Sequence, residues 1–227
     1  MNNCYLGKFE DNLDKIPLVD HIITDIPYNI SKDSNFKGMK DRKNRIGLNF
    51  GEWDHNFDIN ILKLLLPKLK DGGSIILFHS FEQFAELRKV FAELDFKDKI
   101  IWQKTNSMPR NRDRRYINNI EIASWYVKKG KWVFNRQDKY EQCVFTFPSE
   151  SGGGFKRFHP TQKNLNLIKK LILIHTNKND LVLDPFAGSG TTLLACKHLK
   201  RNFLGFEALK KHYNIIKERV LYQKQLD

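Results

Sequence analysis

The chain has 227 residues, of which 39 are lysine or arginine and 26 are aspartate or glutamate, so its formal net charge is +13. Its 41% hydrophobic and 12% aromatic residues exclude a disordered chain, and its length suits one domain spanning residues 1–227. A pI near 9.6 favours a polyanionic partner, although basic composition alone is equally compatible with a protein that binds no nucleic acid.

Cysteine usage and hydropathy exclude several further classes. The three cysteines, Cys4, Cys143 and Cys196, are far apart and form no CxxC pair, which argues against a disulfide framework and against a zinc cluster. The longest apolar runs are about five residues, whereas a bilayer span needs about 20, and the first residues carry no apolar stretch typical of a signal peptide. We therefore expect a cytoplasmic protein with no metal site and no membrane segment.

The predicted elements alternate between strands and helices. In chain order the hydrophobic pattern predicts a strand at 19–24, a helix at 59–69, a strand at 74–79, a helix at 81–94, strands at 100–102 and 121–127, a helix at 165–174, a strand at 181–183, a helix at 191–199, a strand at 202–206 and a helix at 210–223. This alternation predicts a parallel α/β sheet with helices on both faces.

Three polar stretches interrupt that alternation. Residues 31–54 are rich in lysine, arginine, asparagine and glycine, and residues 105–116 and 135–158 are irregular in pattern. Long irregular segments in a compact domain usually serve function, so we expect a mobile loop at 31–54 and target-recognition elements in the other two.

A glycine turn follows the strand predicted at 181–183. Residues 184–192 read DPFAGSGTT and lead into a helix, and Glu207 ends the next strand, 17 residues after Gly190. Glycines at such a turn let a ligand approach the backbone, and an acid at this distance suits ribose hydroxyls. The turn lacks both the P-loop lysine and the third glycine of GxGxxG, so it predicts a nucleoside ligand without a di- or triphosphate. The alternative is a plain strand–turn–helix whose glycines serve packing.

A short polar motif follows the first predicted strand. Asp25, Ile26, Pro27 and Tyr28 stand where the carboxyl end of a strand would place them at a ligand site. The carboxylate and a backbone carbonyl could accept the two protons of an exocyclic amine, and the tyrosine ring could stack on a base. Taken alone, the motif is more typical of a turn that closes a strand.

Together these motifs resemble the β-class DNA amino-methyltransferases, in which a [DNS]PP[YFW] tetrad precedes an FxGxG cofactor motif, in circularly permuted order. Further matches are residues 29–31, 50–54 (FGEWD) and 159–163 (HPTQK), so the resemblance covers almost the whole chain. It is nearest to the small adenine-specific members of restriction-modification systems.

The resemblance implies a Rossmann-like methyltransferase sheet that binds S-adenosyl-L-methionine (SAM). It places Asp25 between cofactor and target, with Glu207 on the ribose hydroxyls. The other cofactor-binding residues that it implies are His159, Lys163, Asp184, Phe186, Gly188, Ser189, Gly190 and Thr191.

Two positions depart from the family pattern. The second tetrad position is Ile26 where the family has proline, although the contact made there is mainly through the backbone. Near the N-terminus the family carries a Gly-Asp that contacts the cofactor adenine, and this chain has Gly7 and Lys8, with Glu10 or Asp11 as candidate substitutes.

The chemistry implied is direct transfer of a methyl group to an adenine N6 that has left the DNA stack. No Pro-Cys pair occurs, which excludes the cysteine-dependent methylation of cytosine C5. Aspartate at the first tetrad position favours adenine N6, with cytosine N4 as the alternative. RNA or protein-glutamine methylation fits the HPTQK segment and the motif order less well, and Ile26 and Lys8 are the only hints of a non-catalytic DNA-binding relative.

The positive charge is concentrated near the predicted site. Residues 104–131 hold eight basic and two acidic residues. Arginine suits phosphate contacts and guanine readout, although a solvated loop is the alternative. We therefore expect double-stranded DNA as partner, with a cognate restriction endonuclease and a second copy of the chain as further candidates. The DNA-binding candidates are Lys43, Arg45, Arg110, Arg112, Arg114 and Arg115.

Overall fold

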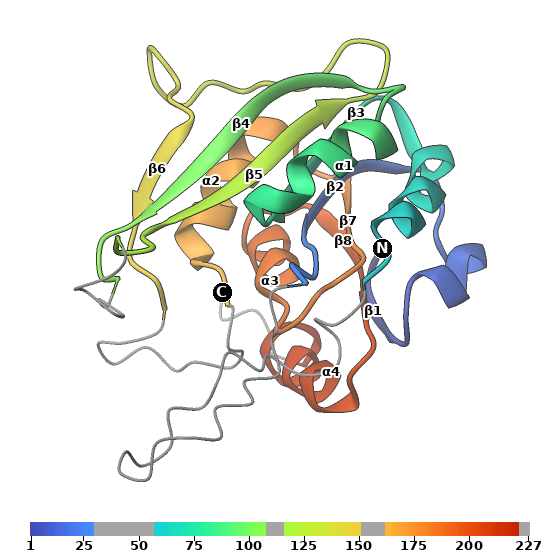
Figure 1. Cartoon of the computed structure of the whole chain (residues 1–227). Helices are drawn as coiled ribbons and strands as arrows, with labels where there is room; N and C mark the ends of the chain where they lie inside the picture. Colours follow the sequence, from blue (N-terminus) through green and yellow to red (C-terminus); the bar gives the residue numbers. More distant parts are fainter. Residues whose placement is uncertain (30–56, 108–115, 151–161, 223–227) are drawn as a thin grey trace, which may run out of the picture.

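A computed structural model describes residues 1–29, 57–107, 116–150 and 162–222. Its centre is one twisted sheet of eight strands in the order β1-β8-β7-β2-β3-β5-β4-β6 (Figure 1). The strands are β1 (Asn2–Leu6), β2 (Val19–Asp25), β3 (Leu69–His79), β4 (Asp95–Lys104), β5 (Ile120–Val127), β6 (Val144–Phe147), β7 (Leu181–Asp184) and β8 (Asn202–Glu207).

The sheet is mixed, so the prediction of an entirely parallel sheet is wrong at β5. Strands β1, β8, β7, β2 and β3 pair in parallel, whereas β5 is antiparallel to both β3 and β4. Lys104 at the end of β4 lies beside Asn119, whose carbonyl accepts its backbone N–H at 2.7 Å. The chain thus leaves the sheet at the end of β4 and re-enters it at the same end in β5. Two consecutive strands joined in this way pair antiparallel.

Helices cover both faces of the sheet, as predicted. On one face α2 (Leu165–His175) and α3 (Thr191–His198) pack with the buried residues of one core cluster (Figure 1). This cluster also takes in Ile216 and Val220 from α4 (Lys210–Ile216) and the π-helical turn η5 (Lys217–Leu221). The other face carries α1 (Phe84–Val90) and the 3-10 helices η1 (Glu10–Lys15), η3 (Ile59–Lys68) and η4 (Phe81–Gln83).

Several elements differ from the predictions in kind or extent. The segment predicted as a helix at 59–69 is 3-10 in form and contains Pro67, which has no N–H to donate. Strand β6 lies inside the stretch predicted to be irregular at 135–158, and β1 was not predicted. Both are short edge strands with mixed polarity, which gives a weak sequence pattern. No helix among the described residues is long and apolar enough to cross a membrane.

The order of the strands brings the two sequence motifs together. Strand β2 lies between β3 and β7, and β8 flanks β7 on the far side. Asp25, Asp184 and Glu207 each end one of these parallel strands, so their side chains meet at one edge of the sheet. This edge is where open α/β sheets bind ligands.

Candidate active site

The tetrad backbone is held by two hydrogen bonds. The N–H of Ile26 donates to the carbonyl of Phe78 at 3.2 Å, which extends the pairing of β2 with β3 by one residue. The buried amide of Gln83 donates from Nε2 to the carbonyl of Pro27 at 2.8 Å. Gln83 itself is fixed, since its Oε1 accepts the N–H of Ser80 at 3.0 Å in a capping box.

The carboxylate of Asp25 belongs to a chain of alternating charges. The ammonium of Lys163 lies 2.5 Å from Asp25 Oδ2 and 2.9 Å from Glu121 Oε2, the latter as an ion pair without hydrogen-bond geometry. Lys104 pairs with Glu121 Oε1 at 2.5 Å. The hydroxyl of Tyr28 is 3.3 Å from the same ammonium. The other oxygen of Asp25, Oδ1, is buried and accepts no hydrogen bond within the described part of the chain.

Burial and charge pull the ionisation of these groups in opposite directions. Burial raises the pKa of Asp25 above its ordinary value, and the neighbouring Lys163 only partly offsets it. Burial disfavours the Lys163 ammonium, yet the carboxylates of Asp25 and Glu121 outweigh it and raise the pKa of Lys163. For Glu121 burial is outweighed by Lys163 and Lys104, which lower its pKa. The arrangement therefore holds two carboxylates around one ammonium.

The glycine turn places Glu207 at the rim of the same site. Gly188 adopts a left-handed φ of +54°, and its N–H donates to Glu207 Oε2 at 2.8 Å. The N–H of Leu209 donates to Oε1 at 2.8 Å, and His212 Nδ1 lies 3.8 Å from the same oxygen. A carboxylate offers about four lone pairs. Glu207 is therefore oriented by backbone donors and retains acceptor capacity for hydroxyl groups.

Asp184 fixes the start of the glycine turn by hydrogen bonds. Its Oδ1 accepts the hydroxyl of Thr24 at 2.7 Å and the N–H of Phe186 at 3.2 Å. Burial raises the pKa of this carboxyl to about 6. Asp184 thus ties β7 to β2 and fixes the direction in which the turn leaves the sheet.

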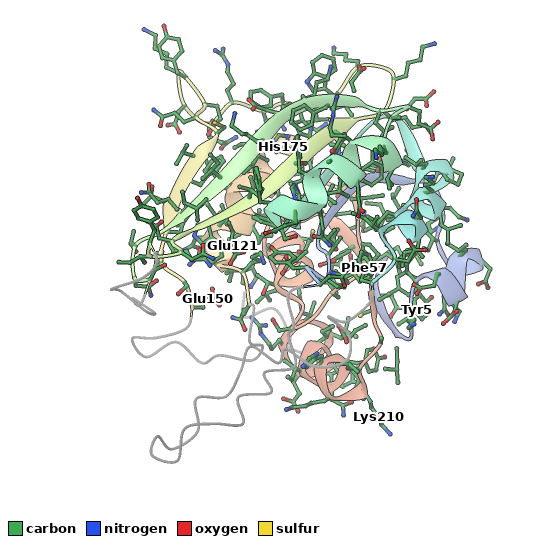
Figure 2. The ribbon with its side chains drawn as sticks, in the orientation of Figure 1. Tyr5, Phe57, Glu121, Glu150, His175 and Lys210 are labelled. Carbon is green, nitrogen blue, oxygen red and sulfur yellow. The ribbon has the colours of Figure 1, made fainter. Side chains whose placement is uncertain are left out.

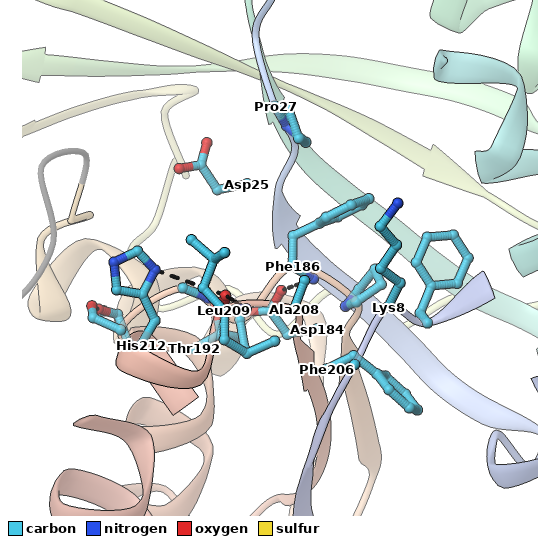
Figure 3. Close-up of a pocket in the computed structure, with 18 of the residues that line it drawn as sticks. Lys8, Asp25, Pro27, Asp184, Phe186, Thr192, Phe206, Ala208, Leu209 and His212 are labelled. Atoms are coloured by element: carbon cyan, nitrogen blue, oxygen red, sulfur yellow. Dashed lines mark hydrogen bonds and ion pairs between the residues drawn. The ribbon is translucent and has the colours of Figure 1, made fainter. Parts of the chain in front are cut away.

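These groups surround one cavity of about 260 Å³ (Figure 3). Its lining includes an aromatic wall in which Phe186 packs edge-on against Phe9 and Phe57, at centroid distances of 5.5 and 5.4 Å. Further lining residues come from the end of β2 and from the segments that follow β7 and β8, as the figure shows with Asp25, Thr192 and His212. Among the residues described there is no group of three or more histidine, cysteine or carboxylate side chains placed to hold a metal ion.

Comparison with known proteins identifies the family. A family model described as DNA methylase, of the N6 and N4 type, matches residues 19–218. The chain belongs to this DNA methylase family. The type II methyltransferase M.HinfI of Haemophilus influenzae is 31% identical over 250 residues, which cover 97% of this chain and 68% of that protein.

Solved structures agree with this assignment. The crystal structure of M1.HpyAVI in complex with SAM is 35% identical, with a TM-score of 0.76 over 97% of this chain and 100% of that chain. The cytosine-N4-specific PvuII DNA methyltransferase is 18% identical, with a TM-score of 0.75 over 100% of this chain and 88% of that chain. The latter likeness shows a shared fold alone.

Most of the predicted site residues that the structure describes line this cavity: Asp25, Pro27, Lys163, Asp184, Phe186, Gly188, Ser189, Thr191 and Glu207. Ile26 and Tyr28 do not line it, although Tyr28 contacts Lys163. Gly190 faces the other way, where a Cβ would lie 3.1 Å from Ile216 Cγ1 and 3.2 Å from Val220 Cγ2. The loop at 31–54 and residues Lys43, Arg45, Arg110, Arg112, Arg114, Arg115 and His159 lie outside the described residues.

The cavity and its surroundings also include residues outside the tetrad and the glycine turn. Gly7, Lys8 and Glu10 line the cavity, whereas Asp11 does not, so of the two candidate substitutes for the family's acidic residue only Glu10 lies in the cavity wall. Lys8 Nζ lies 3.9 Å from Glu10 Oε1. Neither Glu121 nor Gln83 was predicted. In the sequence, Glu121 is a lone carboxylate at the start of an apolar strand. Gln83 lies near the start of a predicted helix, and nothing else in the sequence marks it.

Proposed function

We propose that this DNA methylase transfers a methyl group from SAM to the exocyclic N6 of adenine in double-stranded DNA. The observation that carries the proposal is Oδ1 of Asp25, a buried acceptor with no hydrogen bond among the described residues, at the end of β2 in the cavity that Gly188 and Glu207 also line. A buried acceptor without a donor is costly, and an exocyclic amine supplies that donor.

The residues around the cavity fit SAM. Above Gly188 a Cβ would meet open space, with its nearest neighbour 4.0 Å away, so a ligand can lie against this backbone. The spare lone pairs of Glu207 suit two ribose hydroxyls, and the Phe186 wall suits an adenine ring. The turn has no P-loop lysine, and SAM has no phosphate. When bound, SAM supplies a methyl group on a positively charged sulfur.

The chain's own groups position the amine. An adenine amine is a weak nucleophile because its lone pair is delocalised into the ring. Asp25 Oδ1 accepts one amine proton, and the carbonyl of Ile26 accepts the second, since the carbonyl of Pro27 already accepts from Gln83. Two acceptors favour a pyramidal nitrogen with its lone pair exposed, and positioning together with the Asp25 charge lowers the barrier.

The choice of adenine rests on Asp25 at the first tetrad position, because the fold is shared with a cytosine-N4-specific enzyme. The test is methylation of duplex DNA by the purified protein with SAM, followed by digestion and mass spectrometry of the nucleosides. N6-methyladenine is the expected product. N4-methylcytosine without N6-methyladenine would overturn the assignment of the base, and SAM binding without transfer would favour a non-catalytic relative.

The basic segments of the chain suggest how it would contact DNA. We propose that Lys43, Arg45 and the arginines at 110, 112, 114 and 115 contact DNA, with readout by segments 105–116 and 135–158 and closure by the loop at 31–54. A cognate restriction endonuclease, a homodimer and a cytoplasmic location fit a restriction-modification role. We propose that residues 1–227 form one domain.

Asp25→Ala tests the proposed catalytic residue. The variant should bind DNA and SAM with affinities close to those of the wild type, measured by anisotropy and calorimetry, and should transfer no radiolabelled methyl group. Transfer at the wild-type rate would refute the role of Asp25.

A further inference from the structure

The charge chain around Lys163 has a feature that the tetrad does not explain. Asp25, Lys163, Glu121 and Lys104 alternate in sign and come from β2, the segment before α2, β5 and β4. The Lys163 side chain is only 6% exposed. Glu121, labelled in Figure 2, is the second residue of β5.

The position of Lys163 creates a chemical problem for the proposed reaction. Its ammonium donates to Asp25 Oδ2 at 2.5 Å, so it competes with a target amine for the carboxylate. Positive charge develops on the amine as it gains a methyl group, and a cation beside Asp25 opposes that charge. The reaction therefore requires a group that keeps the Lys163 ammonium away from Oδ1 of Asp25 and balances its positive charge.

Glu121 meets both needs. Its Oε2 lies 2.9 Å from the Lys163 ammonium, which therefore lies between two carboxylates. The other oxygen, Oε1, is taken by Lys104 at 2.5 Å, so the Glu121 carboxylate is fixed from the side away from the site. The backbone N–H of Lys104 in turn donates to the carbonyl of Asn119, and its ammonium lies 5.1 Å from the centroid of the Trp102 ring.

We propose that Glu121 is a positioning residue for methyl transfer: it holds the Lys163 ammonium on the Oδ2 side of Asp25 and balances its charge, which leaves Oδ1 for the target amine. This inference deepens the proposed function and rests on it. Glu121 acts through Lys163 and touches neither cofactor nor base, in the manner of groups that orient a ligand-binding side chain.

The first experiment compares Glu121→Gln with the wild type in the radiolabelled methyl-transfer assay. The variant keeps the shape of the side chain and removes its charge, so the full Lys163 charge falls on Asp25. We expect kcat to fall about 10- to 100-fold while KM for SAM changes less than about threefold. Glu121→Asp, which keeps the charge, should recover part of the lost kcat. Glu93→Gln, at an exposed carboxylate in the turn that follows α1, is the matched control.

A pH profile separates positioning from mere packing. Asp25 acts as a carboxylate, so kcat falls as pH drops through its pKa. Glu121 raises that pKa by like charge, so Glu121→Gln should move the acid limb to lower pH. Lys104→Met removes a cation from the far end of the chain and should move the acid limb slightly to higher pH. Opposite shifts in two variants are not expected from a loss of packing.

The outcomes are distinct from those that test the proposed function. A wild type that transfers no methyl group to DNA would overturn the function. A wild type that transfers, with kcat and acid limb unchanged in Glu121→Gln, would overturn the role of Glu121 alone. Thermal melting of each variant shows whether it folds, and Lys104→Met carries the test if Glu121→Gln does not: an unshifted or oppositely shifted acid limb in that variant would refute the inference.

Discussion

Ile26 gains a contact that a proline at its position could not make. Its N–H donates to the carbonyl of Phe78, and proline has no N–H to donate. The departure from the family tetrad therefore adds a backbone hydrogen bond next to the carboxylate that we propose as catalytic. Gln83 holds the following peptide by its carbonyl, so the tetrad is fixed from both sides.

Replacing Gln83 should loosen this clamp. Gln83→Glu keeps the acceptor for the N–H of Ser80 but presents an oxygen to the carbonyl of Pro27, so the two acceptors repel. We expect a loss of about 1–3 kcal/mol in the free energy of unfolding and a lower kcat, measured by denaturant titration and methyl transfer. Gln142→Glu makes the same change at an exposed site and should alter neither. A variant at position 83 with wild-type kcat would show that the Gln83 bond does not position the tetrad.

The buried carboxyl of Asp184 should make stability depend on pH. Its pKa is raised from 3.8 to about 6 by burial, so protonation favours the folded state. That contribution is complete below about pH 4 and is lost as pH rises through 6. The difference in unfolding free energy between wild type and Asp184→Asn should therefore fall by about 3 kcal/mol across this range. A difference that stays constant with pH would show that Asp184 is not held in a raised-pKa state.

At the scale of elements, the turn between β7 and α3 uses its two glycines for different purposes. Both have positive φ, +54° at Gly188 and +79° at Gly190. A side chain at Gly190 would press on Ile216 and Val220, whereas one at Gly188 would enter open space. The turn thus joins α3 to the C-terminal helices on one side and leaves the cavity free on the other.

Two alanine substitutions should separate these purposes. Gly190→Ala should lower the free energy of unfolding by more than the about 1–2 kcal/mol of the left-handed backbone alone. Gly188→Ala should lower the free energy of unfolding only by the cost of the left-handed backbone. It should also weaken SAM binding, because the added methyl group faces the ligand. Denaturant titration and calorimetry check the pair. Equal stability losses with equal SAM affinity would contradict the assignment.

The sequence predicted the central elements better than the peripheral ones. Strands β2 and β7 were predicted to within one residue, because buried parallel strands are short continuous apolar runs ended by polar turns. The predicted direction of β5 was wrong, since an apolar run has the same pattern in a parallel and in an antiparallel strand. Strand β6 was missed because its alternate residues are exposed, and its place depends on pairing with β4.

For the candidate site, too, residues in local motifs were predicted and residues that depend on long-range contacts were not. Two motifs with a local sequence pattern, the tetrad and the glycine turn, contribute residues to one cavity: Asp25 and Pro27 from the first, and Phe186, Gly188 and Ser189 among others from the second. Glu121 and Gln83 were missed, because their partners Lys163 and Pro27 lie 42 and 56 residues away in sequence. Such pairs follow from strand order and have no local signal.

The net charge of +13 should make DNA binding depend strongly on salt. Raising the salt concentration from about 50 to 200 mM should weaken DNA binding about 1,000-fold if about six phosphates are contacted, because each contact releases counterions. SAM carries no phosphate, so its affinity should change little. Fluorescence anisotropy with duplex DNA and calorimetry with SAM measure the two. DNA affinity that does not change with salt would contradict an electrostatic interface.

The pairing of β1 with β8 has a consequence for how the protein is made. Tyr5 and Leu6 pair with Phe206 and Glu207, and the N–H of Gly7 donates to the carbonyl of Glu207. The wall that Gly7 and Lys8 give to the cavity is therefore translated first, yet it has no neighbour until the strand ending at Glu207 has left the ribosome. The cofactor pocket closes only late in synthesis, and a contact of such long range is slow to form. A cell producing this methylase should thus gain no modification activity from shortened translation products that end before β8.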